Sequence, residues 1–139
     1  MIAIDTNVLV RFLVDDDKEQ AERARSLISN NDVLISTTVL LETEWVLRGG
    51  YEFAPDQIVS GLSLVLGLPQ VRLCETEVVR IGMQLFKERM DFADALHLAR
   101  LGGCGPLRHV RPKADQMGTP AAVANRRHPA LTACSETPP

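Results

Sequence analysis

Short apolar runs alternate with longer amphipathic segments over most of this 139-residue chain. The apolar runs at 2–4, 32–36 and 71–74 are too short for helices and are typical of buried strands. The segments between them repeat apolar residues every three or four positions, which predicts helices with one buried face. Strands that alternate with helices predict an α/β fold with a parallel sheet flanked by helices. We expect helices at 6–13, 15–30, 37–50, 54–69, 75–90 and 91–103.

The alternating pattern stops near residue 104, where the composition of the chain also changes. Residues 105–139 hold six of the eight prolines and none of the six aromatic residues, and no apolar periodicity continues there. Such a segment buries too little apolar surface to offset the entropy cost of ordering its backbone. We therefore expect one folded domain at 1–104 and an irregular C-terminal tail at 105–139.

Charge and composition limit the classes of function. Residues 1–104 carry 16 acidic and 10 basic side chains, a balance of −6, whereas 105–139 carry 2 and 5, a balance of +3. An acidic domain argues against a broad nucleic-acid-binding face, although phosphate can still be bound through metal ions. No apolar run reaches the roughly 18 residues of a membrane span, and no signal-type segment opens the chain, so we expect a cytoplasmic protein without membrane contact. The three widely spaced cysteines predict neither a disulfide framework nor a zinc site.

Asp5 is the first candidate for a functional side chain, because it directly follows the apolar residues 2–4. A carboxylate at the end of a buried strand is unfavourable unless something compensates its charge. Ligands of parallel α/β sheets bind at the carboxyl ends of the strands, which is where Asp5 is expected. Asp5 can equally cap the following helix by accepting a backbone N–H. Its position alone does not decide between these two roles.

Two glutamates in the predicted helix at 37–50 are further candidates. Glu42 and Glu44 lie two residues apart and therefore point in different directions from the helix axis. Glu42 follows an apolar run, which indicates a partly buried face and makes it the stronger candidate. We expect Glu44 to be an ordinary solvent-exposed glutamate.

The segment at 91–103 adds two aspartates. Asp91 lies where the N-cap of a helix is expected, and Asp94 then occupies the third helical position, as in a capping box. Capping explains Asp91 well but Asp94 less well, since a largely apolar helix follows it. His97, one turn further on, is more simply a polar neighbour than a ligand.

Asp5, Glu42 and Asp94 together predict a divalent-cation site. A cluster of carboxylates without a neighbouring Lys or Arg is electrostatically unfavourable unless a cation binds it. Mg²⁺ and Mn²⁺ prefer oxygen ligands, and such an ion can lower the pKa of a bound water for phosphodiester hydrolysis. The bound ion would then generate the attacking hydroxide without a histidine base.

At these residues the sequence resembles the PIN-domain family, in particular the VapC-type toxins of type II toxin–antitoxin systems. The resemblance covers residues 1–104 and implies a parallel sheet with helices on both sides. The stretches that carry it are IAIDTNVLVRFL, ISTTVLLETEWVLR and FKERMDFADALHLA, in this order and spacing.

The resemblance also implies an activity, a site and partners. The activity is Mg²⁺- or Mn²⁺-dependent endoribonuclease cleavage of RNA. Asp5, Glu42 and Asp94 match the family's catalytic acids, with Asp5 and Asp94 as metal ligands. Thr6 and Asp91 match supporting residues of the site. Family members form homodimers and are held inactive by a cognate antitoxin protein.

The chain departs from the family where a fourth acid, usually within a TFD turn, is expected. The segment at 107–117 reads LRHVRPKADQM, and Arg111 stands about where the aspartate belongs. Asp115 lies nearby, but no apolar strand precedes it, so we do not assign it the role. Codons permitted for 107–117, read one base later, can encode FATFDRKLTKW, which contains the missing turn. We therefore favour a frameshift over a native tail.

These observations predict a metal-dependent ribonuclease of the toxin type, impaired by the loss of its fourth acid. The alternative is a degraded, non-catalytic PIN domain that only dimerises or binds the antitoxin. Apolar residues at 45–53 and 62–68 exceed what one small sheet needs and, if partly exposed, supply an interaction surface for either case. A haloacid-dehalogenase-like phosphatase also begins with a strand that ends in Asp. That class needs a second Asp two residues later, where this chain has Asn7.

Overall fold

Parallel strands form the centre of residues 1–102, which are the part of the chain that the structure, a computed structural model, describes. They pair in the order β1-β2-β3, with Ile2 opposite Val33 and Val33 opposite Val71. The strands are β1 (Ile2–Ala3), β2 (Val33–Ile35) and β3 (Val71–Leu73). The predicted α/β fold with a parallel sheet is therefore confirmed.

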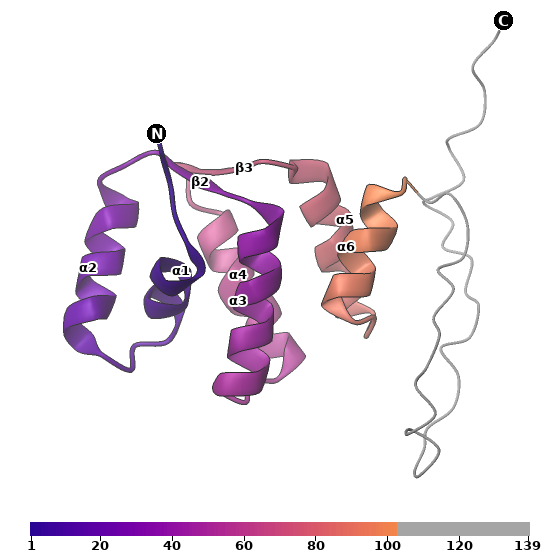
Figure 1. Ribbon diagram of the computed structural model, residues 1–139, viewed down its shortest axis with the longest axis horizontal. Coiled ribbons are helices and arrows are strands. Elements are labelled where there is room, and N and C mark those ends of the chain that lie inside the picture. The colour runs from indigo at the N-terminus through magenta and orange to yellow at the C-terminus, as the bar shows by residue number, and fades with distance from the viewer. Residues whose placement is uncertain (103–139) are drawn as a thin grey trace, which may run out of the picture.

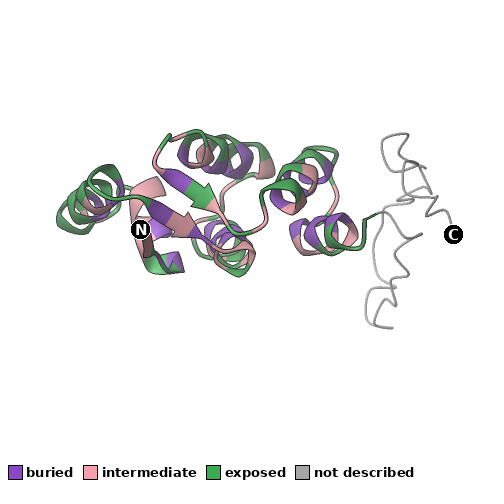
Figure 2. Cartoon of the chain, turned by 90° about the horizontal axis from the view of Figure 1, so that it is seen from above, coloured by how far each residue is buried: buried purple, intermediate pink, exposed green. Residues whose placement is uncertain are grey.

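Helices surround this sheet and connect its strands. Those of the described region are α1 (Thr6–Leu13), α2 (Lys18–Ser29), α3 (Thr37–Gly50), α4 (Pro55–Leu66), α5 (Thr76–Lys87) and α6 (Phe92–Arg100). Helices α1 and α2 lie at one end of the molecule, α5 and α6 at the other, and α3 and α4 between them (Figure 1). Figure 2, a view from above, shows helices on both sides of the strands.

A side-chain cap and one left-handed residue explain why α2 and α5 are shorter than the predicted 15–30 and 75–90. Asp17 accepts the backbone N–H of Gln20, so α2 begins at Lys18 rather than at residue 15. Helix α5 ends at Lys87, and Arg89 then adopts a φ of 71°, which redirects the chain towards α6. Local hydrogen bonds of this kind leave little trace in hydrophobic periodicity.

The hydrophobic core lies between the sheet and the inner faces of the helices (Figure 2). Val33 and Ile35 on the central strand are fully buried. Helices α5 and α6 pack closely, with the Phe86 and Phe92 ring centroids 5.0 Å apart. Gly82 permits this approach, since a Cβ there would lie 2.6 Å from the side chain of Leu96. This packing fixes the helix that carries Asp94 against the rest of the domain.

Several features of the sequence lie outside the described residues. They include the predicted tail at 105–139, the segment at 107–117 and the end of the proposed domain at 103–104. Within residues 1–102, β1 pairs with β2 alone and therefore forms one edge of the sheet. No helix in this region is long and apolar enough to cross a membrane.

Candidate metal centre

Asp5 lies between β1 and α1, at the carboxyl end of its strand. Its Oδ1 atom accepts the backbone N–H of Val8 at 3.0 Å, so Asp5 is the N-cap of α1. The residue is exposed, and the cap does not use its second carboxylate oxygen. Capping is thus established and leaves one oxygen available for a ligand at the sheet edge.

Thr6 links this strand end to the second predicted acid. The Thr6 hydroxyl is buried and donates a hydrogen bond of 2.5 Å to Oε2 of Glu42, 36 residues further along the chain. Hydrogen bonds to a charged acceptor are shorter and stronger than neutral ones. The bond joins the first turn of α1 to α3 and orients the Glu42 carboxylate next to the residue that follows Asp5.

The two glutamates of α3 have environments opposite to those we predicted. Glu42 is exposed, whereas Glu44 is only 1% exposed. The buried stripe of α3 contains Leu40, Thr43, Glu44 and Leu47, the spacing of one helical face. Glu42 lies off that stripe although apolar residues precede it. The expectation of a solvent-exposed Glu44 is therefore wrong, because helical period rather than sequence neighbours determines burial.

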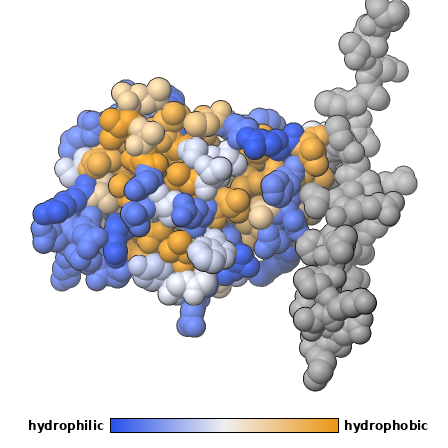
Figure 3. Space-filling view, viewed as in Figure 1, coloured by the Kyte–Doolittle hydropathy of each residue, from blue (hydrophilic) through white to orange (hydrophobic). Residues whose placement is uncertain are grey.

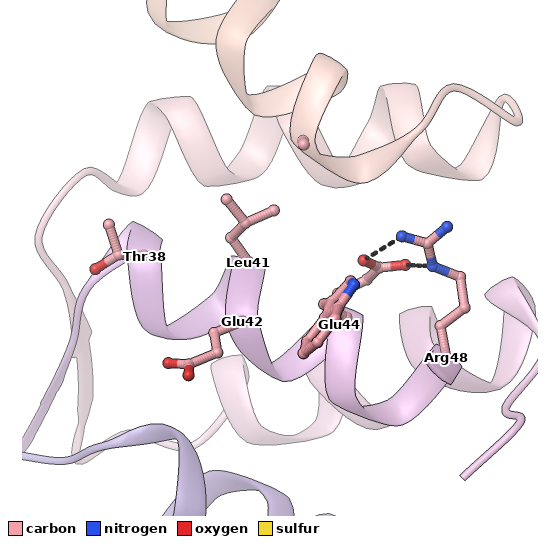
Figure 4. A pocket seen from close by; sticks show the side chains of 7 residues that line it. Thr38, Leu41, Glu42, Glu44 and Arg48 are labelled. Carbon is pink, nitrogen blue, oxygen red and sulfur yellow. Dashed lines mark hydrogen bonds and ion pairs between the residues drawn. The ribbon is translucent and has the colours of Figure 1, made fainter. Parts of the chain in front are cut away.

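Arg48 partly compensates the buried charge of Glu44. Its Nε atom lies 2.9 Å from Oε1 of Glu44, one helical turn earlier on α3 (Figure 4). Burial raises the pKa of the Glu44 carboxyl, the Arg48 guanidinium lowers it and the negative charge of Asp91 raises it further. Figure 4 shows the Glu42 side chain on a different side of α3 from the Glu44–Arg48 pair. Glu44 is therefore engaged in an ion pair with Arg48, and Glu42 remains the candidate metal ligand on this helix.

The first turn of α6 lies beside α3. Asp91 is the N-cap of α6, and its Oδ1 atom accepts the backbone N–H groups of Ala93 at 3.0 Å and Asp94 at 3.4 Å. Ala93 and Glu42 line one open hollow of about 350 Å³. Asp94, the neighbour of Ala93, is half-buried. The predicted capping role of Asp91 is confirmed, and the turn that contains Asp94 lies beside the helix that carries Glu42.

Glu75 is an acidic residue at this edge that our sequence reasoning did not single out. It follows the end of β3 much as Asp5 follows β1. The Thr37 hydroxyl donates to its Oε2 atom at 2.7 Å, and Arg100 Nη2 contacts both carboxylate oxygens at 2.5 and 2.6 Å. The hydrogen bond from Arg100 lowers the pKa of Glu75, and that from Thr37 lowers it further. With both oxygens engaged, Glu75 connects α6 to the sheet rather than offering a ligand.

The donor chemistry of the edge suits a hard divalent cation. Asp5, Glu42 and Asp94 all supply carboxylate oxygens, the ligands that Mg²⁺ and Mn²⁺ prefer. Within residues 1–102, however, no group of three or more Asp, Glu, His or Cys side chains is close enough to hold an ion. The helices and the strand end that carry the three acids lie next to one another, but a shared ion requires their side chains to turn towards one another. Convergence of the three acids on one ion stays a prediction.

The fold and the carboxylates at its strand ends define an α/β domain of the type that binds ligands at the carboxyl edge of a parallel sheet. A comparison with protein families matches the PIN domain over residues 2–100. The chain therefore belongs to the PIN domain family, whose members are generally nucleases that use divalent metals. Comparisons with curated proteins and with solved structures found no match.

Replacing Thr6 with Val tests whether the hydroxyl holds Glu42 in place. Val keeps the buried shape but removes the donor, so we expect the free energy of unfolding to fall by roughly 1 kcal/mol. The loss is modest because Glu42 is exposed and regains water. Thr76→Val is the matched control, since Thr76 is also the first residue of its helix but is exposed. Equal urea midpoints for the two variants would contradict the role of the Thr6–Glu42 bond.

Proposed function

We propose that this PIN domain is a divalent-metal-dependent endoribonuclease of the VapC toxin type. The observation that carries the proposal is the hydrogen bond from Thr6 to Glu42. It connects Thr6, the residue after Asp5 at the end of β1, with Glu42 on α3. The family resemblance implies that Glu42 is a catalytic acid. The hollow shared by Glu42 and Ala93 extends this connection to the turn that contains Asp94.

The three acids would form one ligand set in the proposed site. Asp5 and Asp94 would hold Mg²⁺ or Mn²⁺, and Glu42 would complete the acidic ligand set. When bound, the ion supplies water activation and neutralises charge on the phosphate during hydrolysis. The N-cap bond from Val8 holds the Asp5 carboxylate at the strand end, while the Thr6 hydroxyl holds the Glu42 carboxylate against the first residue of α1.

RNA as the substrate is compatible with the charge of the domain. With a balance of −6 over residues 1–104, the protein surface offers little general attraction to a polyanion. Binding through a cation at one acidic site avoids that difficulty, because the ion presents positive charge where phosphate must approach. We therefore propose that RNA is recognised close to the metal ligands and not over a broad basic face.

We also propose a homodimer and a cognate antitoxin as partners. Trp45 on α3 is 66% exposed and Leu64 on α4 is 74% exposed, and both offer apolar surface that a partner can cover. Figure 3 shows apolar residues reaching the surface in the middle of one face, between hydrophilic ends. The surface is smaller than the sequence suggested, since Leu47, Leu62 and Val65 are buried.

RNA cleavage by the purified full-length chain tests the proposed function. We expect cleavage of single-stranded RNA with Mn²⁺ or Mg²⁺, loss of cleavage with EDTA, and recovery when excess metal is returned. Single-stranded DNA with the same base sequence serves as a substrate control. A preparation that is folded and binds Mn²⁺ but cuts no RNA, even with a restored reading frame, would support the non-catalytic alternative instead.

A further inference from the structure

Glu44 is a buried carboxylate whose position is not explained by the proposed chemistry. It is 1% exposed, and its Oε1 atom has no hydrogen-bond partner in the described region. That atom lies 2.9 Å from Arg48 Nε, close enough for an ion pair but without hydrogen-bond geometry. The pair is buried on the Glu44 side alone, since the Arg48 side chain is 48% exposed, and the desolvation of the carboxylate offsets much of the attraction. Its presence therefore calls for a reason other than stability.

Arg48 also reaches the N-terminus of α6. Its Nη1 atom lies 3.7 Å from Oδ2 of Asp91, while Oδ1 of the same carboxylate accepts the N–H groups of Ala93 and Asp94. One carboxylate thus contacts α3 through one oxygen and caps α6 through the other. The Glu44–Arg48–Asp91 link connects the helix of Glu42 to the backbone of Asp94.

Two hollows that are open to solvent lie beside this link. A hollow of about 350 Å³ on one side is lined by Glu44, Arg48 and Ala93. A second hollow of about 260 Å³ is lined by Glu44, Arg48 and Asp91. Solvent therefore reaches this side of the first turn of α6. Packing holds the inner side of α6, where Phe92 and Ala95 are fully buried. The charge pairs of the guanidinium lie on the solvent side of the same turn, where they can set how near it lies to α3.

We propose that Arg48 is a positioning residue that fixes Asp94 relative to Glu42 through the Glu44–Arg48–Asp91 link. The inference rests on the proposed function for its catalytic meaning. Burial of Glu44 holds the guanidinium in one orientation, and the planar fork of Arg can then face a second carboxylate. A Lys ammonium lacks this fork. Asp91 acts here as a cap and an ion-pair partner and not as a metal ligand.

Amide hydrogen exchange of the metal-free full-length chain tests the link itself. In Arg48→Met the amides of the first turn of α6 should exchange faster than in the wild type, about tenfold, while those of α2 stay unchanged. Arg23→Met is the matched control, because Arg23 forms an exposed ion pair with Glu19 on α2. Unchanged exchange in the first turn of α6 overturns the proposal, whatever the protein's activity.

Mn²⁺ affinity, measured by calorimetry, tests the consequence for the site. Removing a residue that orients ligands weakens metal binding by about 10- to 100-fold, and we expect the lower value for Arg48→Met. Adding Glu44→Met removes the unpaired buried charge and should restore the unfolding midpoint but not the Mn²⁺ affinity. If affinity returns together with stability, Arg48 has only a structural role and the proposal is wrong. If the wild type binds no Mn²⁺, the proposed function fails and the catalytic meaning of the link fails with it, whereas the exchange result still decides whether the link exists.

Discussion

Replacing Asp5 with Asn should lower RNA cleavage by at least about 100-fold, close to 3 kcal/mol in activation free energy. Asn caps a helix about as well as Asp, so the bond to the N–H of Val8 and the stability of α1 should survive. The loss then reports the missing negative charge at the strand end rather than unfolding. The rate should be measured in a chain with a restored reading frame, so that the cleavage rate before the substitution is high enough for the decrease to be measured.

His97→Ala is the matched control for this experiment. His97 lies on α6, three residues after Asp94, and is exposed. If the metal ion activates the attacking water, removal of the imidazole should change the rate by less than about threefold. Comparable losses in Asp5→Asn and His97→Ala would point to a histidine base and contradict the metal-dependent account.

Restoring the reading frame so that residues 107–117 read FATFDRKLTKW should raise solubility, metal affinity and RNA cleavage together. A fourth carboxylate adds a charged ligand, and affinity for divalent ions grows with ligand charge, here by about tenfold or more. A further strand could pair with β1, which forms an edge of the sheet within residues 1–102. Open edges promote aggregation, so pairing should also improve solubility.

The nucleotide sequence around codons 100–110 is the first check on this prediction. A single inserted or deleted base there would support the frameshift directly. The corrected and uncorrected chains should then be compared for Mn²⁺ affinity and cleavage rate. If the uncorrected chain already binds Mn²⁺ as tightly, or if Asp115 proves to be a ligand, the tail is native and the fourth acid has only moved.

Hydrophobic periodicity predicted the whole order of helices and strands in the described region. The helix at 6–13 and the helix at 37–50 have the expected bounds, because strong apolar stripes lie between capping residues. The predicted start of α2 and the predicted end of α5 were less accurate. The Asp17 cap determines the first, and the left-handed backbone of Arg89 determines the second. Such local geometry depends on single residues and not on a repeating pattern.

The candidate site was predictable only where a residue's role depends on its own element. Asp5 and Asp91 precede helices, and the sequence predicted that each could be an N-cap. The burial of Glu44 could have been predicted by extending the stripe through Leu40 and Leu47 instead of relying on adjacent residues. The bond between Thr6 and Glu42 joins distant segments, and no local pattern indicates it.

The contacts of Arg48 and Glu75 had no sequence signal for the same reason. Arg48 pairs with Glu44 within its helix, which a four-residue spacing permits, but its approach to Asp91 depends on how α6 packs against α3. Glu75 meets Arg100 only because α6 returns to the end of β3. Tertiary packing therefore determines which charges at this edge are neutralised by arginine and which remain for a cation.

The anomalous scattering of Mn²⁺ in crystals of the full-length chain tests the central claim most directly. The account predicts one or two peaks at the carboxyl edge of the sheet, each with oxygens of Asp5 and Asp94 at about 2.1 Å and Glu42 completing the acidic set. The side chains of these residues should have turned towards one another, with the Thr6 hydroxyl still bound to Glu42. Peaks that share no ligand between Asp5 and Asp94, or no peak at this edge at saturating Mn²⁺, would contradict it.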